Sequence, residues 1–215
     1  MEERDTRQRD LIPRKRMERC RATVVGVGAI GRQVALQLAA MGVPWLQLVD
    51  HDLVETVNLA PQGYIEEDLG KPKVEATGSL CKALNSTVTI EPIKERFRRS
   101  MDLGNVLFCC VDSIATRRLI WEAVRDRVEF FCDGRMSADV LRVLVASSKE
   151  SRAHYGTTLF SQEEAYQGSC TSRSTIFCAN IAAGFMLSQF SRWLRGLPVD
   201  KDLMLNLLSS EFSST

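Results

Sequence analysis

Several features that mark particular classes of protein are scarce in this sequence. No apolar run reaches the roughly 20 residues that a membrane-spanning helix needs, and the charged start, Met-Glu-Glu-Arg-Asp-Thr-Arg-Gln, lacks the apolar segment of a signal peptide. The formal net charge is only +1, so no strong field points to nucleic acid or to a membrane surface. We therefore expect a cytoplasmic protein that binds neither nucleic acid nor membrane.

Paired cysteines are also missing. The seven cysteines are an odd number, and no two of them have Cys-x-x-Cys spacing, so the sequence gives no support for a zinc site. Most of them lie in segments with the pattern of strands or helices, as in a reduced protein. Cys109 and Cys110 fall in an apolar run and are interpreted as small core residues. A chain of 215 residues is long enough to bury the core of one α/β domain.

A nucleotide-binding pattern lies between residues 22 and 52. Apolar runs over 22–27 and 45–49 predict two buried parallel strands, and residues 33–41 have the apolar spacing of a helix. Asp50 follows the second run. This strand-helix-strand order, closed by an acid, is typical of nucleotide sites in open parallel sheets.

The turn after the first strand holds three glycines in G-x-G-x-x-G spacing, Gly26, Gly28 and Gly31. Glycines there let the backbone approach a phosphate at the N-terminus of a helix. Asp50 is placed to bind ribose hydroxyls, and Asp52 to serve a metal-bound phosphate, which is one acid more than an NAD site needs. A structural turn without a ligand is the alternative to this nucleotide site.

The connection after Asp52 is polar and carries Asn58 and Gln62. It falls where the carboxyl ends of the strands open, which is where ligands bind in doubly wound sheets. Lys73 then begins a helix expected to reach about Leu84. The helix dipole disfavours a cation at that end unless a polyphosphate is bound there.

Further strands are predicted over 87–93, 106–111 and 129–132, and a possibly antiparallel one over 140–146. Together with the first two they predict an α/β fold with a Rossmann-like, doubly wound, mostly parallel sheet and added antiparallel strands toward the C-terminus. Asp112 follows the strand over 106–111.

Three regions describe the domain organisation that we expect. Residues 1–21 form a highly charged arm, and 22–215 form a single domain. Within it, residues 147–169 lose periodicity, and long loops of this kind are usually functional or disordered. The whole crossover, 147–175, includes Cys170 and leads into an apolar helix over 176–194.

The ordered set of motifs resembles the ThiF/MoeB and ubiquitin-activating-enzyme superfamily of adenylyltransferases. The resemblance covers roughly residues 20 to 195. The motifs that carry it are Gly26-x-Gly28-x-x-Gly31, Asp50-x-Asp52, Asn58-Leu59, Gln62, Gly70-x-Pro72-Lys73, and Asp112 with Arg117 five positions later.

The resemblance implies an ATP-binding site that uses Mg²⁺. The glycines would hold the phosphates and Asp50 the ribose, while Asn58 and Gln62 would line the phosphate pocket. Lys73 would neutralise charge on the α-phosphate and Asp112 would help to bind Mg²⁺. The family adenylates the C-terminal glycine of a small β-grasp protein, either ubiquitin-like or a sulfur carrier.

Two further elements bear on transfer and assembly. Cys170-Thr171 resembles the Cys-Thr that carries a thioester in ubiquitin-activating enzymes, and a thiolate at the head of a helix would be nucleophilic. This would imply a partner of the ubiquitin-conjugating type. Arg7-Gln8 resembles an Arg-Gln element whose arginine reaches the neighbouring subunit's nucleotide, which implies a homodimer.

The sequence departs from the family at two points. Pro61 occupies the place where an arginine usually precedes the glutamine, and Arg32 or an arm arginine is a possible substitute. The paired Cys-x-x-Cys of many bacterial members is absent.

Two alternatives remain. One is a non-catalytic scaffold that binds a ubiquitin-like partner, which Pro61 supports. The other is an NAD-dependent oxidoreductase, which leaves Asp52, Asn58, Gln62 and Lys73 unexplained and lacks an evident His or Lys-Tyr hydride site.

Overall fold

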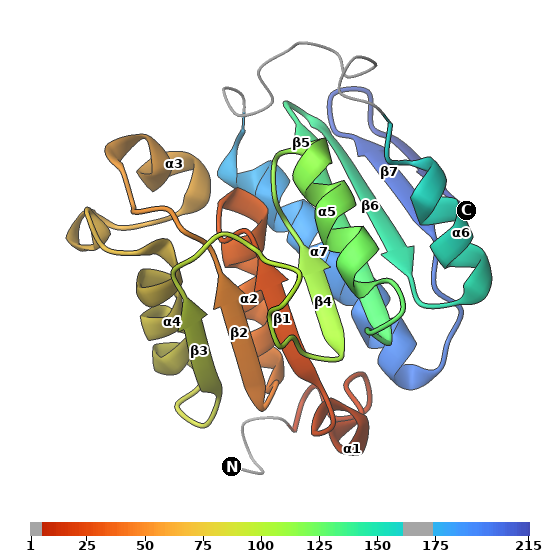
Figure 1. The fold of residues 1–215 in the computed structure, drawn as a ribbon, viewed down its shortest axis with the longest axis horizontal. Coiled ribbons are helices and arrows are strands. Elements are labelled where there is room, and N and C mark those ends of the chain that lie inside the picture. The colour runs from red at the N-terminus through yellow and green to blue at the C-terminus, as the bar shows by residue number, and fades with distance from the viewer. Residues whose placement is uncertain (1–5, 161–173) are drawn as a thin grey trace.

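A single eight-stranded sheet organises the molecule. The computed structural model describes residues 6–160 and 174–215. The strand order is β3-β2-β1-β4-β5-β6-β7-β8, and helices lie on both faces (Figure 1). The strands are β1 (Arg21–Val25), β2 (Trp45–Val49), β3 (Thr89–Ile93), β4 (Val106–Cys109), β5 (Phe130–Ser137), β6 (Val140–Ala146), β7 (Asp202–Asn206) and β8 (Glu211–Ser214).

The pairing of these strands confirms the predicted fold class. β1 to β5 are joined by parallel pairs, whereas β6, β7 and β8 are added in antiparallel pairs. The chain runs outward from β1 to β3 and then returns to the other side of β1 to form β4. The order therefore reverses between β1 and β4, and ligands bind in the crevice outside the carboxyl ends of strands at such a switch point.

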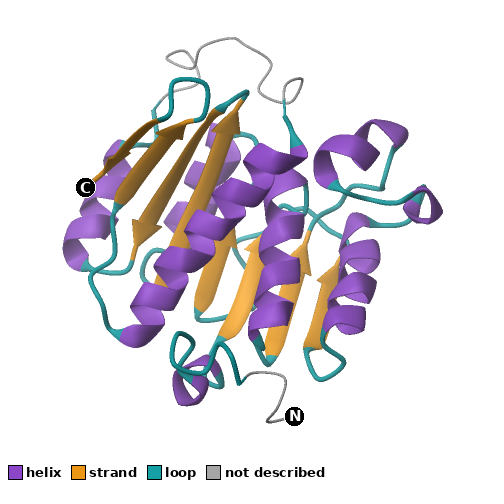
Figure 2. Ribbon diagram, turned by 180° about the vertical axis from the view of Figure 1, so that it is seen from behind, coloured by secondary structure: helices purple, strands orange, loops and turns teal. Residues whose placement is uncertain are grey.

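Helices form a layer on each side of the sheet. On the face toward the viewer in Figure 2 lie α2 (Ala29–Met41), α4 (Lys73–Leu84) and α7 (Ile176–Arg195), and α5 (Ile114–Val124) and α6 (Lys149–Thr157) cover the other face. The short helical segments are α1 (Arg14–Met17), η1 (Thr56–Asn58), α3 (Leu59–Gln62) and η2 (Glu66–Asp68). Among the described helices, none combines the length and apolar character that a bilayer crossing requires.

Strand alternation divides the core into two layers. Phe130 packs with Phe108 and Phe190 on the α2 and α7 side, whereas its neighbour Phe131 packs with Trp121 and Tyr155 on the α5 and α6 side. Successive side chains of a strand point to opposite faces, so β5 serves both layers. Full burial on both sides fixes the central strands and hence the loops at their carboxyl ends.

The structure corrects the prediction of a continuous loop over 147–169. Residues Lys149–Thr157 form α6. Ser148 caps its N-terminus, because the Ser148 hydroxyl accepts a hydrogen bond from the Ser151 amide. Only Ser151 and Tyr155 of this helix are buried. A helix with so few apolar contacts leaves almost no periodic apolar signal in the sequence, which is why the pattern indicated a loop.

Candidate functional site

The glycine turn is packed so closely that side chains are excluded from two of its positions. Gly26 has a φ of +86°, and a Cβ atom there would lie 2.8 Å from the carbonyl oxygen of Cys110. A Cβ on Gly31 would lie 1.8 Å from the carbonyl oxygen of Gly26. Gly28 is different, because the nearest atom to a Cβ there is Gln62 Oε1 at 3.9 Å. The first and third glycines shape the turn, and Gly28 keeps its outer side open.

Asp50 joins this turn to the end of β2. Its two carboxylate oxygens accept hydrogen bonds from the Val27 amide (2.7 Å) and the Asp52 amide (2.9 Å). The side chain is only 9% exposed. Asp50 therefore sets the shape of the glycine turn before any ligand is considered. Each carboxylate oxygen has a second lone pair for a further donor such as a ribose hydroxyl.

A buried lysine faces the second acid. Lys73 Nζ lies 3.0 Å from Asp52 Oδ2, and the Lys73 side chain is 7% exposed whereas that of Asp52 is 48% exposed. His51 Nε2 lies 3.3 Å from Asp52 Oδ1. The helix dipole at the start of α4 disfavours a cation, and Asp52 offsets this within the free protein. Negative charge from a bound ligand would have the same effect.

Arg32 holds the loop beside the glycine turn. It is 1% exposed. Its guanidinium donates to the Gly63 carbonyl (3.0 and 3.2 Å) and to Thr77 Oγ1 (3.1 Å), and it lies over the Tyr64 ring at 4.0 Å. All of these contacts are internal. Arg32 therefore does not replace the arginine missing at Pro61, and that part of the sequence interpretation is wrong.

Tyr64 is a residue that sequence reasoning missed. Its hydroxyl donates to the carbonyl of Val27, at 2.7 Å, inside the glycine turn. Burial raises the pKa of Tyr64 to about 12, so the hydroxyl keeps its proton. The only sequence signal for this role was the position of Tyr64 directly after Gln62 and Gly63. The hydrogen bond to Val27 forms because the loop folds back onto the glycine turn.

Asn58 and Gln62 both lie in the loop before Tyr64, and their amide groups differ. Asn58 Oδ1 accepts a hydrogen bond from the Glu55 amide at 2.9 Å and so stabilises η1. Gln62 Oε1 is buried beside Gly28 without a hydrogen-bond partner among the described residues. A buried polar atom without a partner is costly in a protein interior. Gln62 is thus the residue of this loop that is best placed to meet a ligand.

Asp112 is exposed in the loop that follows β4, at the same edge of the sheet as the glycine turn. The two loops touch, because a Cβ on Gly26 would lie 3.0 Å from the Val111 amide nitrogen. The structure thus brings the three glycines, Asp50, Asp52, Gln62, Lys73 and Asp112 to one edge.

This edge fits a nucleotide phosphate group. The N-terminus of α2 opens at Gly28, and the first turn of α2 has no acidic residue. A helix N-terminus favours anions, and Lys73 adds a buried cation. Asp50, His51 and Asp52 each bring a polar atom within 4.8 Å of the others, so two carboxylates lie side by side at this edge. The unpartnered Gln62 Oε1 adds a hydrogen-bond acceptor beside Gly28, which suits a donor such as a ribose hydroxyl.

Arg7, unlike the residues above, lies away from this cluster. Arg7 is exposed, and its segment packs against the far ends of α2 and α7 through Gln8 and Leu11, at the edge where the strands begin (Figure 1). Within one chain, Arg7 does not reach the glycine turn. Cys170 lies outside the described residues. Cys178, the weaker thiol candidate, is buried in α7, and burial raises its pKa.

Comparisons with known proteins identify the family of the sequence and the fold of the structure. The sequence matches the ThiF family over residues 5–209. It is 34% identical over 111 residues to the SAMP-activating enzyme E1 of Haloferax volcanii, covering 49% of this chain and 41% of that protein. It is 38% identical over 78 residues to the adenylyltransferase and sulfurtransferase MOCS3 of Arabidopsis thaliana, covering 36% and 17%. Each match therefore spans less than half of the relative. The crystal structure of Escherichia coli MccB with MccA-N7isoASN has the same fold, with a TM-score of 0.77 at 17% identity, covering 100% of this chain and 71% of that one.

Proposed function

The chain belongs to the ThiF family, and from this membership we propose that it is an ATP-dependent adenylyltransferase. Its substrate would be the C-terminal glycine of a ubiquitin-like or sulfur-carrier protein. The observation that carries the proposal is the buried Lys73, which presents its ammonium to the edge where the glycine turn opens. Asp52 balances this charge in the free protein, and a bound polyphosphate would give the ammonium a second anionic partner at the start of the helix.

Each residue of the cluster has a distinct task in this proposal. The amides at the start of α2 bind the phosphates, and Gln62 lines the same pocket beside Gly28, where its Oε1 accepts a hydrogen bond from a ribose hydroxyl. Asp50 accepts hydrogen bonds from the ribose hydroxyls. Asp112, with its exposed carboxylate, helps to bind the Mg²⁺ that accompanies ATP, and this ion neutralises charge on the triphosphate. These assignments follow the family resemblance, and the location of the residues at one edge of the sheet supports them.

The reaction requires charge neutralisation and alignment more than acid-base chemistry. A glycine carboxylate oxygen attacks the α-phosphorus, the bond from that phosphorus to the bridging oxygen breaks, and pyrophosphate leaves with the bonding electrons. The product is an acyl-adenylate. Lys73 stabilises the negative charge that builds on the α-phosphate, for which it exchanges its contact with Asp52 for a phosphate oxygen. Because Asp52 is half exposed, this exchange leaves no charge buried alone.

A second step would transfer the acyl group to Cys170. The thiolate attacks the acyl carbon, AMP leaves, and a thioester forms. The support for this step is the Cys170-Thr171 sequence. The burial of the six described cysteines agrees with it, because five of them are fully buried and Cys110 is half-buried. A ubiquitin-conjugating type of partner, and a homodimer in which Arg7 reaches the neighbouring subunit, belong to the same proposal. The proposal also includes the division into an arm at 1–21 and one domain at 22–215, and the use of Mg²⁺ with ATP.

One experiment tests both steps. The purified chain is incubated with ATP, Mg²⁺ and a panel of glycine-ended ubiquitin-like proteins, and pyrophosphate exchange is measured. The same samples, with wild type and Cys170→Ala, are run on a non-reducing gel. Exchange with a reductant-sensitive adduct that Cys170→Ala loses supports both steps. Exchange with an adduct unchanged in Cys170→Ala removes the thioester assignment and keeps the adenylyltransferase.

Pro61 is the observation that supports the alternative of a binding scaffold without turnover. It stands in α3, where the family usually has an arginine, and the buried Arg32 does not supply a replacement. A binding scaffold that has lost turnover is therefore the second candidate. ATP binding without exchange for any partner would favour this scaffold over the enzyme. Binding of NAD in preference to ATP would instead favour an oxidoreductase.

A further inference from the structure

A buried ion pair lies under the loop that carries Asp112. Asp133, at the carboxyl end of the parallel part of β5, is 0% exposed. Its carboxylate forms an ion pair with Arg117 of α5 and accepts hydrogen bonds from Arg135 Nε (2.8 Å) and the Tyr155 hydroxyl (2.9 Å). One buried carboxylate thus holds donors from β5, α5 and α6. These contacts tie the three elements together in the interior of the protein.

Arg117 connects this network to the backbone of the neighbouring loop. Its Nη2 donates to the carbonyl of Val111, the residue before Asp112, and to the carbonyl of Gly134 at 3.2 Å. Val111 in turn packs on the glycine turn, since a Cβ on Gly26 would lie 3.0 Å from the Val111 amide nitrogen. Arg117 therefore fixes the stretch of backbone between the turn and Asp112.

Only an arginine has the shape for these contacts. The guanidinium is a planar fork of five donors, so it reaches a carboxylate and two carbonyls at once, whereas a lysine ammonium is a point charge on a flexible stem. The Arg117 side chain is 7% exposed, so water has little access to take over a lost hydrogen bond. A lysine at this position keeps the charge opposite Asp133 and loses the hold on Val111.

We propose that Arg117, held by Asp133, is a positioning residue that sets Asp112 against the glycine turn for binding of Mg²⁺-ATP. This inference rests on the proposed function, because it assumes that Asp112 helps to bind the metal ion. Arg117 touches neither nucleotide nor metal. It acts through the backbone of Val111, so its effect on the Mg²⁺ dependence should require Asp112.

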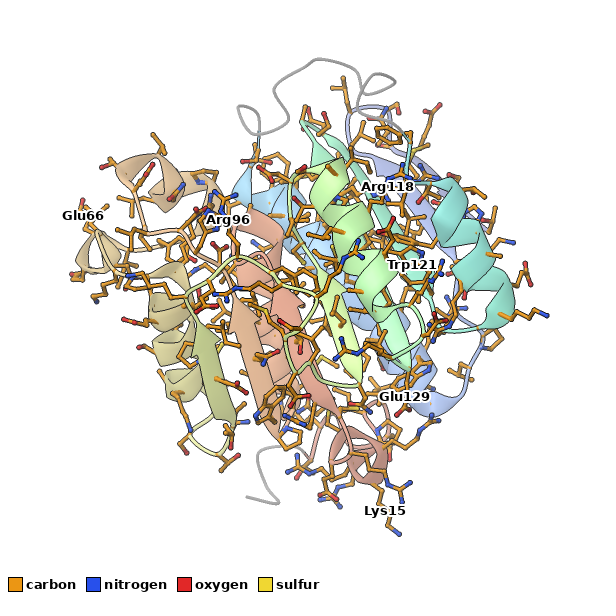
Figure 3. The ribbon with its side chains drawn as sticks, viewed as in Figure 1. Lys15, Glu66, Arg96, Arg118, Trp121 and Glu129 are labelled. Carbon is orange, nitrogen blue, oxygen red and sulfur yellow. The ribbon has the colours of Figure 1, made fainter. Side chains whose placement is uncertain are left out.

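The neighbouring residue on α5 offers a matched control. Arg118, which is labelled in Figure 3, follows Arg117 in the sequence of α5. It is exposed and donates to the carbonyls of Leu159 and Phe160 instead of to the Asp112 loop. Arg117→Lys and Arg118→Lys thus make the same chemical change one residue apart. The measurement is ATP binding by calorimetry at a series of Mg²⁺ concentrations, without turnover and without a partner protein.

We expect Arg117→Lys to raise the Mg²⁺ concentration for half-maximal enhancement of ATP binding by about tenfold, while ATP binding without Mg²⁺ stays within about twofold. Arg118→Lys should leave both quantities unchanged. In an Asp112→Ala background, Arg117→Lys should add no further shift. An equal shift in both backgrounds, or no shift in the wild-type background, would overturn the proposal.

Two further results keep the test decisive. If Arg117→Lys does not fold, Asp133→Asn takes its place, since the amide keeps the size of the carboxylate and weakens its hold on Arg117. It should give the same Asp112-dependent shift, and its failure to do so would equally overturn the proposal. If wild type binds no ATP with or without Mg²⁺, the proposed function itself fails. If ATP binds but Arg117 and Asp112 act independently, only this inference fails.

Discussion

Lys73 Nζ and Asp52 Oδ2 are 3.0 Å apart, although the two residues are 21 positions apart in the chain. The backbone repeats the link, because the Lys73 amide donates to the Asp52 carbonyl at 3.0 Å. The lysine is almost fully buried and the acid is half exposed. Asp52 is thus free to move toward solvent or a metal ion, whereas Lys73 stays at the edge of the sheet. This asymmetry is what the proposed chemistry needs.

Replacing Lys73 should separate catalysis from binding. We expect Lys73→Met to lower the rate of pyrophosphate exchange by about 100- to 1000-fold, because one preorganised donor to a developing charge is worth that much. The affinity for ATP should change far less. Lys71→Met is the control, since Lys71 is exposed and pairs with Asp68. Equal losses in the two variants would contradict a specific role for Lys73.

The glycine turn provides a comparison between packing and ligand access. Gly31→Ala should destabilise the fold by more than about 2 kcal/mol, because its Cβ would collide with the Gly26 carbonyl oxygen and the backbone must move. Gly28→Ala has space for its methyl group and should cost less than about 1 kcal/mol, as ordinary substitutions at open positions do. It should instead weaken ATP binding. Urea unfolding and calorimetry measure the two effects. A strongly destabilised Gly28→Ala would show that this interpretation of the turn is wrong.

Arg32 should behave as a structural residue. Truncation to alanine leaves the Gly63 carbonyl and the Tyr64 ring without their partner, and we expect a loss of about 2–4 kcal/mol in the free energy of unfolding. Arg32→Lys should recover part of this loss. The measurement is urea denaturation followed by circular dichroism. If Arg32→Ala unfolds like wild type yet loses exchange activity, Arg32 belongs to the catalytic site after all.

The reactivity of the cysteines at pH 8 should depend on whether their thiols are buried. Burial raises the pKa of Cys20 and of Cys81 to about 12. A thiol with a raised pKa stays protonated until the pH approaches that value, so roughly one molecule in ten thousand carries either thiolate at pH 8. We expect iodoacetamide at pH 8 to label Cys170 in the folded protein and the two buried thiols only after unfolding. Peptide mass spectrometry reads the sites. Labelling of Cys81 as fast as Cys170 would contradict the burial argument.

The sequence was sufficient to predict the parts of the fold that repeat a local pattern. The strand, glycine turn, helix, strand and acid between residues 22 and 52 are found as β1, α2 and β2, with Asp50 at the end of β2. The antiparallel addition after β5 was also predicted. In each case buried apolar residues or steric limits of the backbone leave a signal along the chain.

The rest depends on contacts between distant segments. Arg32 donates its hydrogen bonds to Gly63 and Thr77, and Tyr64 donates to the Val27 carbonyl. Both sets of contacts form only because the loop folds back over α2. The helix α6 has too few buried residues to leave a periodic signal. The sequence motif places Arg117 five residues after Asp112. That spacing does not predict that the Arg117 guanidinium donates to the Val111 carbonyl.

The central claim is that this chain joins ATP to the C-terminal glycine of a protein partner. The most direct measurement is the exchange of labelled pyrophosphate into ATP with one ubiquitin-like protein in two forms, intact and lacking its final glycine. The account predicts exchange that requires the intact partner and Mg²⁺, and that Lys73→Met slows by about 100- to 1000-fold. Exchange that does not depend on the final glycine, or ATP binding with no exchange across a full panel of such partners, would contradict it.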